Sequence, residues 1–121
     1  MRPLLQTRFQ EFNKRFHNFQ DAEFRSVEIL SASEIQLTLA LQDTNRGFDW
    51  ITLTLFFSGV IDARLIDEQK LHLLDMSEGA ALIYDENMFA FGIGACYNIS
   101  TIKNSAFYIL SKSLKYKEGL F

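Results

Sequence analysis

The fold of this 121-residue chain is decided by the stretch Arg46–Asp67, which reads RGFDWITLTLFFSGVIDARLID. It contains the only tryptophan, a run of β-branched and aromatic residues, and a glycine at position 59. Such residues favour extended strands, and Ser58-Gly59 marks a turn or a bulge. The stretch therefore predicts the central strand pair of an antiparallel sheet, formed by Trp50–Phe57 and Val60–Ile66.

The N-terminal region predicts a helix. Its apolar residues recur at spacings of three and four, which places them on one stripe of a helical surface. These residues are Leu5, Phe9, Phe12, Phe16 and Phe19. Pro3 suits a first helical turn, where its missing N–H costs nothing. We therefore expect a helix over Pro3–Phe19 that packs its aromatic stripe on the sheet.

Two extended segments are expected before the central stretch. Val27–Leu30 is the shorter one. From Ile35 to Gln42, apolar and polar residues alternate strictly, which is the pattern of a strand with one apolar face. The polar segment Asp43–Gly47 then predicts a turn into the central stretch.

The segments after the central stretch are less regular. Leu71–Leu74 fits either a strand or a helical turn. Ala80–Tyr84 and Met88–Tyr97 predict a hairpin joined by a three-residue polar turn. Ile99–Ser105 is expected to be a polar loop. Ala106–Tyr116 fits a strand or a capped helix, and its aromatic and β-branched start favours the strand.

Two glycines lie inside the second strand of that hairpin. Gly92 and Gly94 share one strand face with Ala90 and Cys96, and glycines in strands usually mark a close approach by another element. The N-terminal helix is the favoured neighbour, because its bulky aromatic stripe needs small residues opposite it. A ligand that rests on bare backbone is the alternative.

These elements predict one α+β domain over residues 1–121, with an N-terminal helix packed on an antiparallel β-meander of about six strands. Twelve phenylalanines supply bulk for a substantial core. The single cysteine, Cys96, excludes an intrachain disulfide and is expected to be a small buried apolar group. No apolar run suits a signal peptide or a membrane helix, so a cytoplasmic protein without membrane association is expected.

Charge is distributed unevenly along the chain. Met1–His17 carries four basic residues and one acidic residue, and Lys103–Glu118 has the same balance. Between Asp43 and Glu86, nine acidic residues face three basic ones. Nucleic-acid binding by this middle region is disfavoured, because phosphate contacts need lysine and arginine. The acidic middle would attract a basic protein partner. Alternatively, the basic ends simply neutralise it.

The chain contains no phosphate loop, dinucleotide fingerprint, nucleophile elbow or zinc pattern. His17 and His72 lack partners at metal-ligand spacing. Asp62, Asp67 and Asp75 would have to converge in space to hold a divalent cation or to act as an acid pair, and their spacing does not impose such a geometry. We therefore predict no catalytic residue, no cofactor and no metal site.

The segment FDWITLTLFFSGVIDARL, followed after a gap by an apolar hairpin, resembles small bacterial proteins of uncharacterised or immunity-protein families over roughly Phe48–Tyr97. In those families an aromatic-rich strand precedes a Gly-Val step within a single antiparallel sheet. The resemblance implies a protein that neutralises a partner toxin through an acidic or aromatic surface. It carries over no individual functional residue.

Three functions are expected as alternatives. The first is a non-enzymatic protein-binding domain of the immunity type, which neutralises a basic partner through an acidic surface. Its contact residues would be Asp43, Asp49, Trp50, Asp62, Asp67, Asp75 and Glu78. The second is a small-ligand binder or enzyme with a pocket near Trp50, Gly92, Gly94 and His72. The third is a homo-oligomeric module, such as a homodimer, joined through a sheet edge or the Phe-rich helix.

Overall fold

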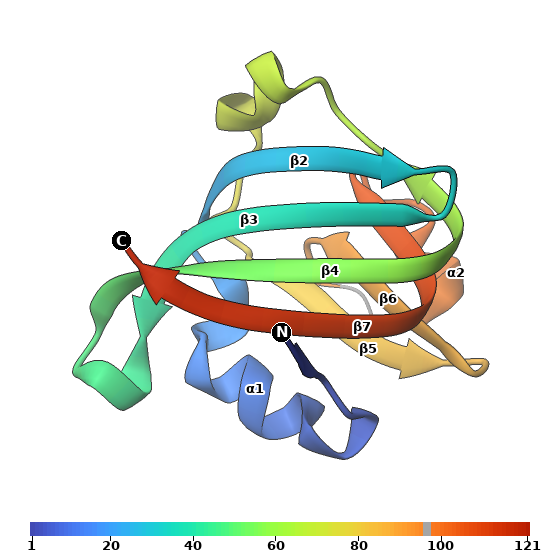
Figure 1. The fold of residues 1–121 in the computed structure, drawn as a ribbon. Helices are drawn as coiled ribbons and strands as arrows, with labels where there is room; N and C mark the ends of the chain where they lie inside the picture. The colour runs from blue at the N-terminus through green and yellow to red at the C-terminus, as the bar shows by residue number, and fades with distance from the viewer. Residues whose placement is uncertain (96–97) are drawn as a thin grey trace.

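The computed structural model describes residues 1–95 and 98–121, so Cys96 and Tyr97 lie outside the described residues. The described chain has an α+β fold, as predicted (Figure 1). Its strands are β1 (Arg2–Pro3), β2 (Glu23–Ser31), β3 (Glu34–Asp43), β4 (Asp49–Arg64), β5 (Ala80–Asp85), β6 (Met88–Ile93) and β7 (Tyr108–Leu120). Its helices are α1 (Phe9–Arg15) and α2 (Ile99–Ile102), with 3-10 segments η1 (Gln6–Arg8), η2 (His17–Phe19), η3 (Thr44–Arg46) and η4 (Glu68–Leu73).

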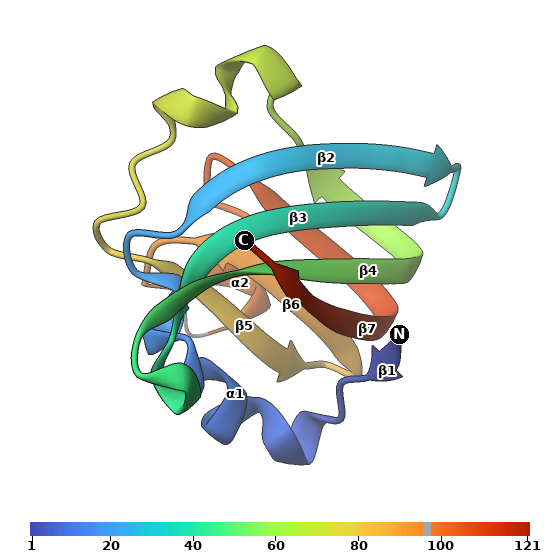
Figure 2. The ribbon, with the colours of Figure 1, turned by 60° about the vertical axis from the view of Figure 1, so that its left-hand side comes forward.

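The described strands form one antiparallel sheet in the order β2-β3-β4-β7-β6-β5, with β1 alongside β7. The prediction of a meander is wrong in one respect, because β7 enters between β4 and β6. The sheet curls, so that β5 and β6 cross behind the other strands (Figures 1 and 2). Phe91 of β6 consequently contacts Phe24 of β2 and Phe57 of β4, with ring centroids 6.2 Å apart in each pair.

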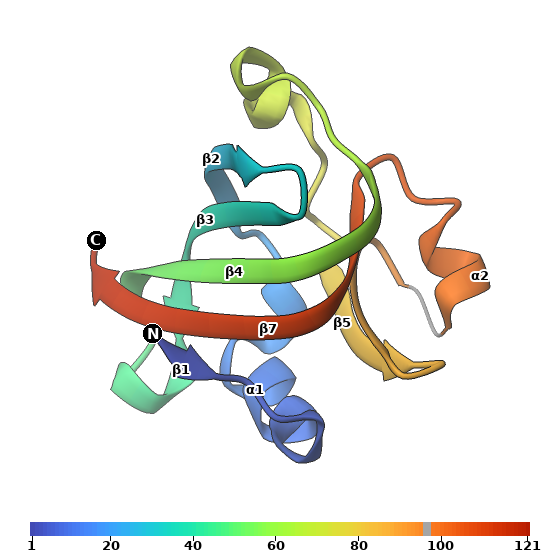
Figure 3. The same cartoon turned by 45° about the vertical axis from the view of Figure 1, so that its right-hand side comes forward.

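The central stretch folds as one strand of 16 residues, not as the strand pair that we predicted. Gly59 has a φ of 64°, and the pairing of β4 with β7 shifts register between Val60 and Asp62. Ser58-Gly59 therefore lies inside a continuous strand rather than in a turn, and the bulge follows it, between Val60 and Asp62. A bulge bends its strand, and β4 and β7 curve together from the front of the sheet toward β5 (Figure 3).

The core lies inside the curl and is built from the alternation that the sequence displays. Apolar residues of β3 and β4 face inward in directly opposed pairs: Ile35 with Phe57, Leu37 with Leu55, Leu39 with Leu53, and Leu41 with Ile51. All of these side chains are buried. The prediction of a strand over Ile35–Gln42 with one apolar face is therefore confirmed.

The N-terminal helix is shorter than predicted. Pro3 lies in β1 opposite Lys115, and the chain that follows is divided into η1, α1 and η2. Leu5 is exposed, and its neighbour Leu4 is buried in its place. The rest of the predicted stripe is buried: Phe9, Phe12, Phe16 and Phe19. These rings pack into the curled sheet, and α1 covers its lower end in Figure 1.

The element that approaches Gly92 is α2. We had predicted the N-terminal helix or a ligand at this place. A Cβ added at Gly92 would lie 3.3 Å from the side chain of Ile102, which is fully buried. The segment Ile99–Ser105, predicted to be a loop, contains this helix. It begins at Asn98, whose side chain accepts a hydrogen bond from the backbone N–H of Thr101 at 2.9 Å in a capping box.

Other open alternatives are decided by the structure. Leu71–Leu74 belongs to the 3-10 segment η4 and its end, so it is a helical turn. The hairpin is confirmed, although its second strand ends at Ile93 and not at Tyr97. Ala106–Tyr116 is largely strand, as favoured, within β7. No helix among the described residues is long and apolar enough to cross a membrane.

A tight turn between α1 and β2 has an unusual backbone. His17, Asn18 and Phe19 have φ values of 53°, 53° and 60°, in the left-handed region that side chains disfavour. Phe16 and Phe19, at 1% and 0% exposed, anchor the turn in the core. Burial of two aromatic rings offsets the cost of this conformation, which is about 1–3 kcal/mol for each strained residue.

Gly79 passes directly against this turn, and we predict that it tolerates no side chain. Its φ is 75°, and a Cβ there would collide with the backbone carbonyl of Asn18. Gly79→Ala should lower the free energy of unfolding by about 3 kcal/mol or more, because backbone atoms must move in addition to the left-handed penalty. Gly47→Ala is the matched control, since Gly47 has a φ of 64° and open space around the added carbon.

The control variant should lose only about 1–2 kcal/mol. Urea denaturation of both variants measures the difference. Equal losses would contradict the collision with Asn18 and leave only the backbone conformation as the cause.

Candidate functional site

Two acidic side chains point into the interior at one end of the sheet. The inward-facing positions of β3 continue from Leu41 to Asp43, which has no exposed surface. On β7, Glu118 is paired with Leu53 of β4, whose side chain is fully buried. Paired residues on adjacent strands share a face of the sheet, so Glu118 also faces inward, with 15% of its side chain exposed.

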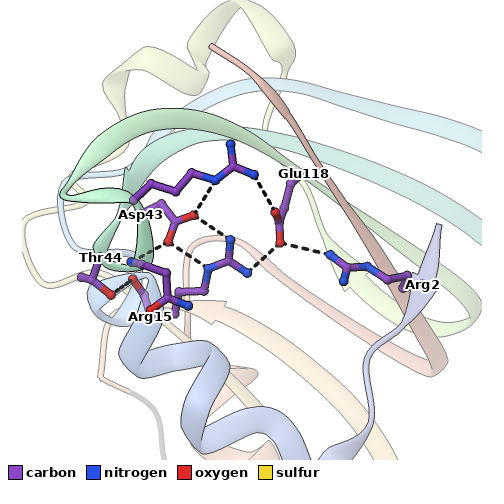
Figure 4. A network of polar contacts seen from close by, with 7 residues as sticks. Arg2, Arg15, Asp43, Thr44 and Glu118 are labelled. Atoms are coloured by element: carbon purple, nitrogen blue, oxygen red, sulfur yellow. Dashed lines mark hydrogen bonds and ion pairs between the residues drawn. The ribbon is translucent and has the colours of Figure 1, made fainter.

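Arg15, at the end of α1, binds both carboxylates (Figure 4). Its Nε and Nη2 donate to Oδ1 and Oδ2 of Asp43 at 2.8 and 2.6 Å, and its Nη1 donates to Oε1 of Glu118 at 2.6 Å. The paired contact with Asp43 is the strong bidentate form of the arginine–carboxylate bond. Arg2 approaches Glu118 at 3.1 Å, and Arg46 approaches Glu118 at 3.3 Å and Asp43 at 3.4 Å. We call these five residues the arginine network.

The arginine network keeps its carboxylates charged. The hydrogen bonds from Arg15 lower the pKa of Asp43, against the opposing effect of burial, and the N–H of Asn45 contributes at 3.0 Å. Arg15 likewise lowers the pKa of Glu118. The pKa of Arg15 is raised, chiefly by its bonds to Asp43. Three guanidinium groups therefore face two carboxylates, which leaves one positive charge in excess.

A cleft of about 700 Å³ lies beside the arginine network, between the N-terminal segment and the end of the sheet. Its apolar lining consists of Pro3, Leu4, Leu5, Phe12 and Tyr116. Its charged lining consists of Arg2, Arg8, Glu11, Lys14 and Arg15, and Thr44 and Asn45 complete it. The volume falls within the range of about 300–1,000 Å³ that is usual for small-molecule pockets.

A second feature is the connection Leu65–Gly79 between β4 and β5, which we call the acidic loop. Its charged residues are all exposed, and they are Asp67, Glu68, Asp75 and Glu78 against Lys70. Leu73 is 70% exposed among them. The backbone and hydroxyl of Ser77 bind Asp75 and lower its pKa, so this carboxylate stays charged. The acidic loop thus exposes negative charge and one apolar side chain.

The left-handed turn holds the far end of the acidic loop. The N–H of Asp21 donates to the carbonyl of Met76 at 2.8 Å, and Gly79 lies against Asn18. At the other side, η4 lies above β2 in Figure 1. Strained backbone persists only where surrounding contacts impose it, and such residues cluster at binding and active sites.

The predicted partner-contact residues divide between two places. Asp67, Asp75 and Glu78 are all exposed on the acidic loop. Asp49 and Trp50 lie at the opposite end of β4 from the acidic loop. The ring of Trp50 packs there against Phe121, with centroids 5.8 Å apart.

The other two predicted contact residues are engaged inside the fold. Asp43 was expected on the surface, but it is fully buried and held by Arg15, so it presents no charge to a partner. Asp62 is half-buried and accepts a hydrogen bond from the Oη of Tyr108 at 3.0 Å. The acidic surface is therefore smaller than the sequence indicated.

The residues of the predicted ligand pocket do not meet. Gly92 pairs with Tyr108, and Tyr108 pairs with Arg64, at the end of β4 opposite to Trp50. Gly94 lies beyond β6 with open space around it, and His72 is exposed on η4. None of the predicted pocket residues lines the cleft beside α1.

Among the described residues, no group of three histidine, aspartate or glutamate side chains is arranged to hold a metal ion. Comparisons with protein families, with curated proteins and with solved structures found no match for this chain. The class that the fold itself defines is an α+β domain built on a curled antiparallel sheet.

Arg15→Met is expected to be strongly destabilising, because buried Asp43 loses its bidentate partner and keeps only the longer contact to Arg46, at 3.4 Å. Loss of one partner from a buried ion pair costs about 3–5 kcal/mol. Arg8→Met removes a comparable side chain from a pair with Glu11 in which both members are largely exposed, and it should cost less than about 1 kcal/mol. Urea denaturation compares the two variants.

Adding Asp43→Asn to Arg15→Met should recover part of the loss, since the uncompensated charge is then gone. A double variant that is no more stable than Arg15→Met would contradict the assignment of the loss to that charge.

The arginine network should also produce acid sensitivity. The pKa values of Asp43 and Glu118 are lower in the folded protein than in the unfolded chain, where they are about 3.9 and 4.3. The unfolded chain therefore binds more protons in acid, and the network stabilises the fold fully only above about pH 5. The free energy of unfolding should begin to fall as pH drops below about 5, and it should continue to fall through the folded-state pKa values.

The double variant Asp43→Asn, Glu118→Gln should show a shallower dependence on acid. Urea denaturation over about pH 2 to 7 gives both profiles. Parallel profiles for the wild-type protein and the double variant would assign the acid sensitivity to other carboxylates.

Proposed function

We propose that this chain is a non-enzymatic protein-binding domain of the immunity type, which neutralises a basic partner by docking it against the acidic loop. The observation that carries the proposal is that one braced loop exposes four carboxylates together with the apolar side chain of Leu73. The aliphatic side chain of Leu73 can enter a pocket of the partner, while the carboxylates of the acidic loop meet basic residues of the partner. A protein interface commonly combines an apolar centre with a polar rim in this way.

Charge on the acidic loop would act mainly on the rate of association. Opposite charges steer two proteins together before contact and raise the association rate. Four carboxylates against Lys70 give the loop a clear negative balance. Salt screens this attraction over about 8–10 Å at physiological ionic strength, so complex formation should weaken as salt is raised.

The left-handed turn supports the same proposal through preorganisation. A loop that must become ordered on binding loses affinity, because immobilisation of each side chain costs free energy. Gly79 and Met76 tie the end of the acidic loop to the turn, which is itself anchored by buried Phe16 and Phe19. Part of the ordering is therefore completed during folding.

A cytoplasmic location is proposed as well, and a single cysteine suits a reducing compartment.

A homodimer joined through a sheet edge is the second candidate, and β2 is the edge that favours it. Ile29 and Leu30 of this strand are 69% and 49% exposed. However, the pairing of β2 with β3 shifts register twice, and irregular edge strands discourage strand addition. Sedimentation equilibrium decides this candidate, because a monomer at high protein concentration removes it.

The proposal predicts that removal of charge from the acidic loop slows partner binding. The partner is first captured from lysate of the source cells at low salt and released at high salt. The variant Asp67→Asn, Asp75→Asn, Glu78→Gln should then bind it about tenfold more slowly, with little change in the dissociation rate. Surface plasmon resonance measures both rates. Asparagine at position 75 retains an acceptor for the N–H of Ser77, so the loop should keep its conformation.

The matched control also loses three exposed carboxylates, at Glu23, Glu28 and Glu86, none of which is among the predicted contact residues. It should associate at the rate of the wild-type protein, apart from a small effect of net charge. Equal slowing of both variants would mean that only overall charge matters, which would remove the acidic loop as the docking surface.

A further inference from the structure

We propose that the cleft beside α1 binds a small organic anion that carries an apolar or aromatic part. The site is separate from the acidic loop, and the inference does not rest on the proposed function. It rests on three properties of the cleft: uncompensated positive charge, guanidinium groups that are already held in place, and an apolar lining.

The charge around the cleft is positive after every ion pair is considered. The arginine network holds one guanidinium more than carboxylates. Lys14 has no acidic partner among the described residues, which adds a second positive charge. Arg8 is paired with Glu11 at 3.1 Å, but both side chains are largely exposed, and such a pair contributes little. Arg8 can therefore turn to a ligand at small cost.

The guanidinium groups are held in position before any ligand arrives. A guanidinium has five N–H groups, and Arg15 uses three of them in its bonds to Asp43 and Glu118. The plane of Arg15 is thereby fixed, and two N–H groups remain. Arg2 lies over the ring of Tyr116, with its Cζ 4.8 Å from the centroid, and it is also bonded to Glu118. Less side-chain freedom is lost on binding when the cations are already ordered.

The apolar lining defines the rest of the ligand. Leu4 and Phe12 are buried at the base of the cleft, and Pro3 and Leu5 are exposed at its side. The ring of Phe12 meets Tyr116 edge to face, with centroids 5.1 Å apart. A bare inorganic anion would leave this surface in water, whereas an aromatic or aliphatic body would bury it and gain from the hydrophobic effect. The cleft therefore suits an amphipathic anion, with its carboxylate, sulfonate or phosphate toward Arg2, Lys14 and Arg15.

The test uses anilinonaphthalene sulfonate, a fluorescent aromatic anion, and phenylnaphthylamine, its uncharged counterpart. Fluorescence titration should give one saturable site for the anion and at least tenfold weaker binding of the neutral probe. Lys14→Gln and Arg8→Gln should each weaken binding of the anion about threefold to tenfold, because each removes one cation from the rim. Lys70→Gln, on η4, is the matched control and should leave binding unchanged.

All three substituted side chains are exposed, so the variants should fold, and their urea denaturation midpoints verify this. Equal affinity for the charged and neutral probes would overturn the proposal, since the site would then be a general apolar surface. Loss of affinity by Lys70→Gln equal to that of Lys14→Gln would overturn it too. The acidic-loop variant should bind the probe as the wild-type protein does, which separates this inference from the proposed function.

Discussion

The ion pair between Arg15 and Asp43 is the interaction on which the arrangement of this protein depends. A carboxylate with no exposed surface cannot stay charged in the interior unless a cation and hydrogen bonds satisfy it. Arg15 meets both needs with one planar group, and it also reaches Glu118 on a strand distant in the chain. The end of α1 is therefore bound to β3 and β7 at once, and the position of α1 in turn creates the cleft.

A buried ion pair of this kind contributes more to the conformational specificity of a protein than to the net stability of the folded state. Taking two charges out of water opposes most of their attraction, so an apolar pair of the same volume could stabilise the fold equally. The charged pair adds a preference for the native strand register over alternative registers. A slip of one residue in the pairing of β3 would turn Asp43 to the outside and leave Arg15 without its partner. The network therefore favours one strand register and one docking position of α1.

Local patterns in the sequence predicted local structure well. Alternation identified β3, and the three-and-four spacing identified the phenylalanines that become buried, because both signals come from residues close together in the chain. The prediction was weaker at Gly59, since a glycine within an apolar run fits a turn as well as a bulge. The left-handed turn at His17–Phe19 was not predicted, because none of its residues is a glycine.

The functional features were harder to predict because they depend on contacts between distant residues. Arg15 is 28 positions from Asp43 and 103 positions from Glu118, and no spacing rule joins them. One signal was available, since the alternation of β3 continues through Asp43 and places its carboxylate on the apolar face. A buried acid of that kind requires a basic partner, and the N-terminal region is rich in candidates. The insertion of β7 into the sheet had no comparable local signal.

The place of β7 has a consequence for the way this protein is made. β7 is the last of the described strands, yet it joins β4 to β6 and so connects the two parts of the sheet. While a ribosome is still producing the preceding residues, both parts have an unpaired inner edge and an incomplete core. The domain can close only after residues as late as Glu118 have left the exit tunnel, so the sheet is completed in one late step rather than gradually. During that interval the exposed edges of β4 and β6 are the surfaces that chaperones must shield.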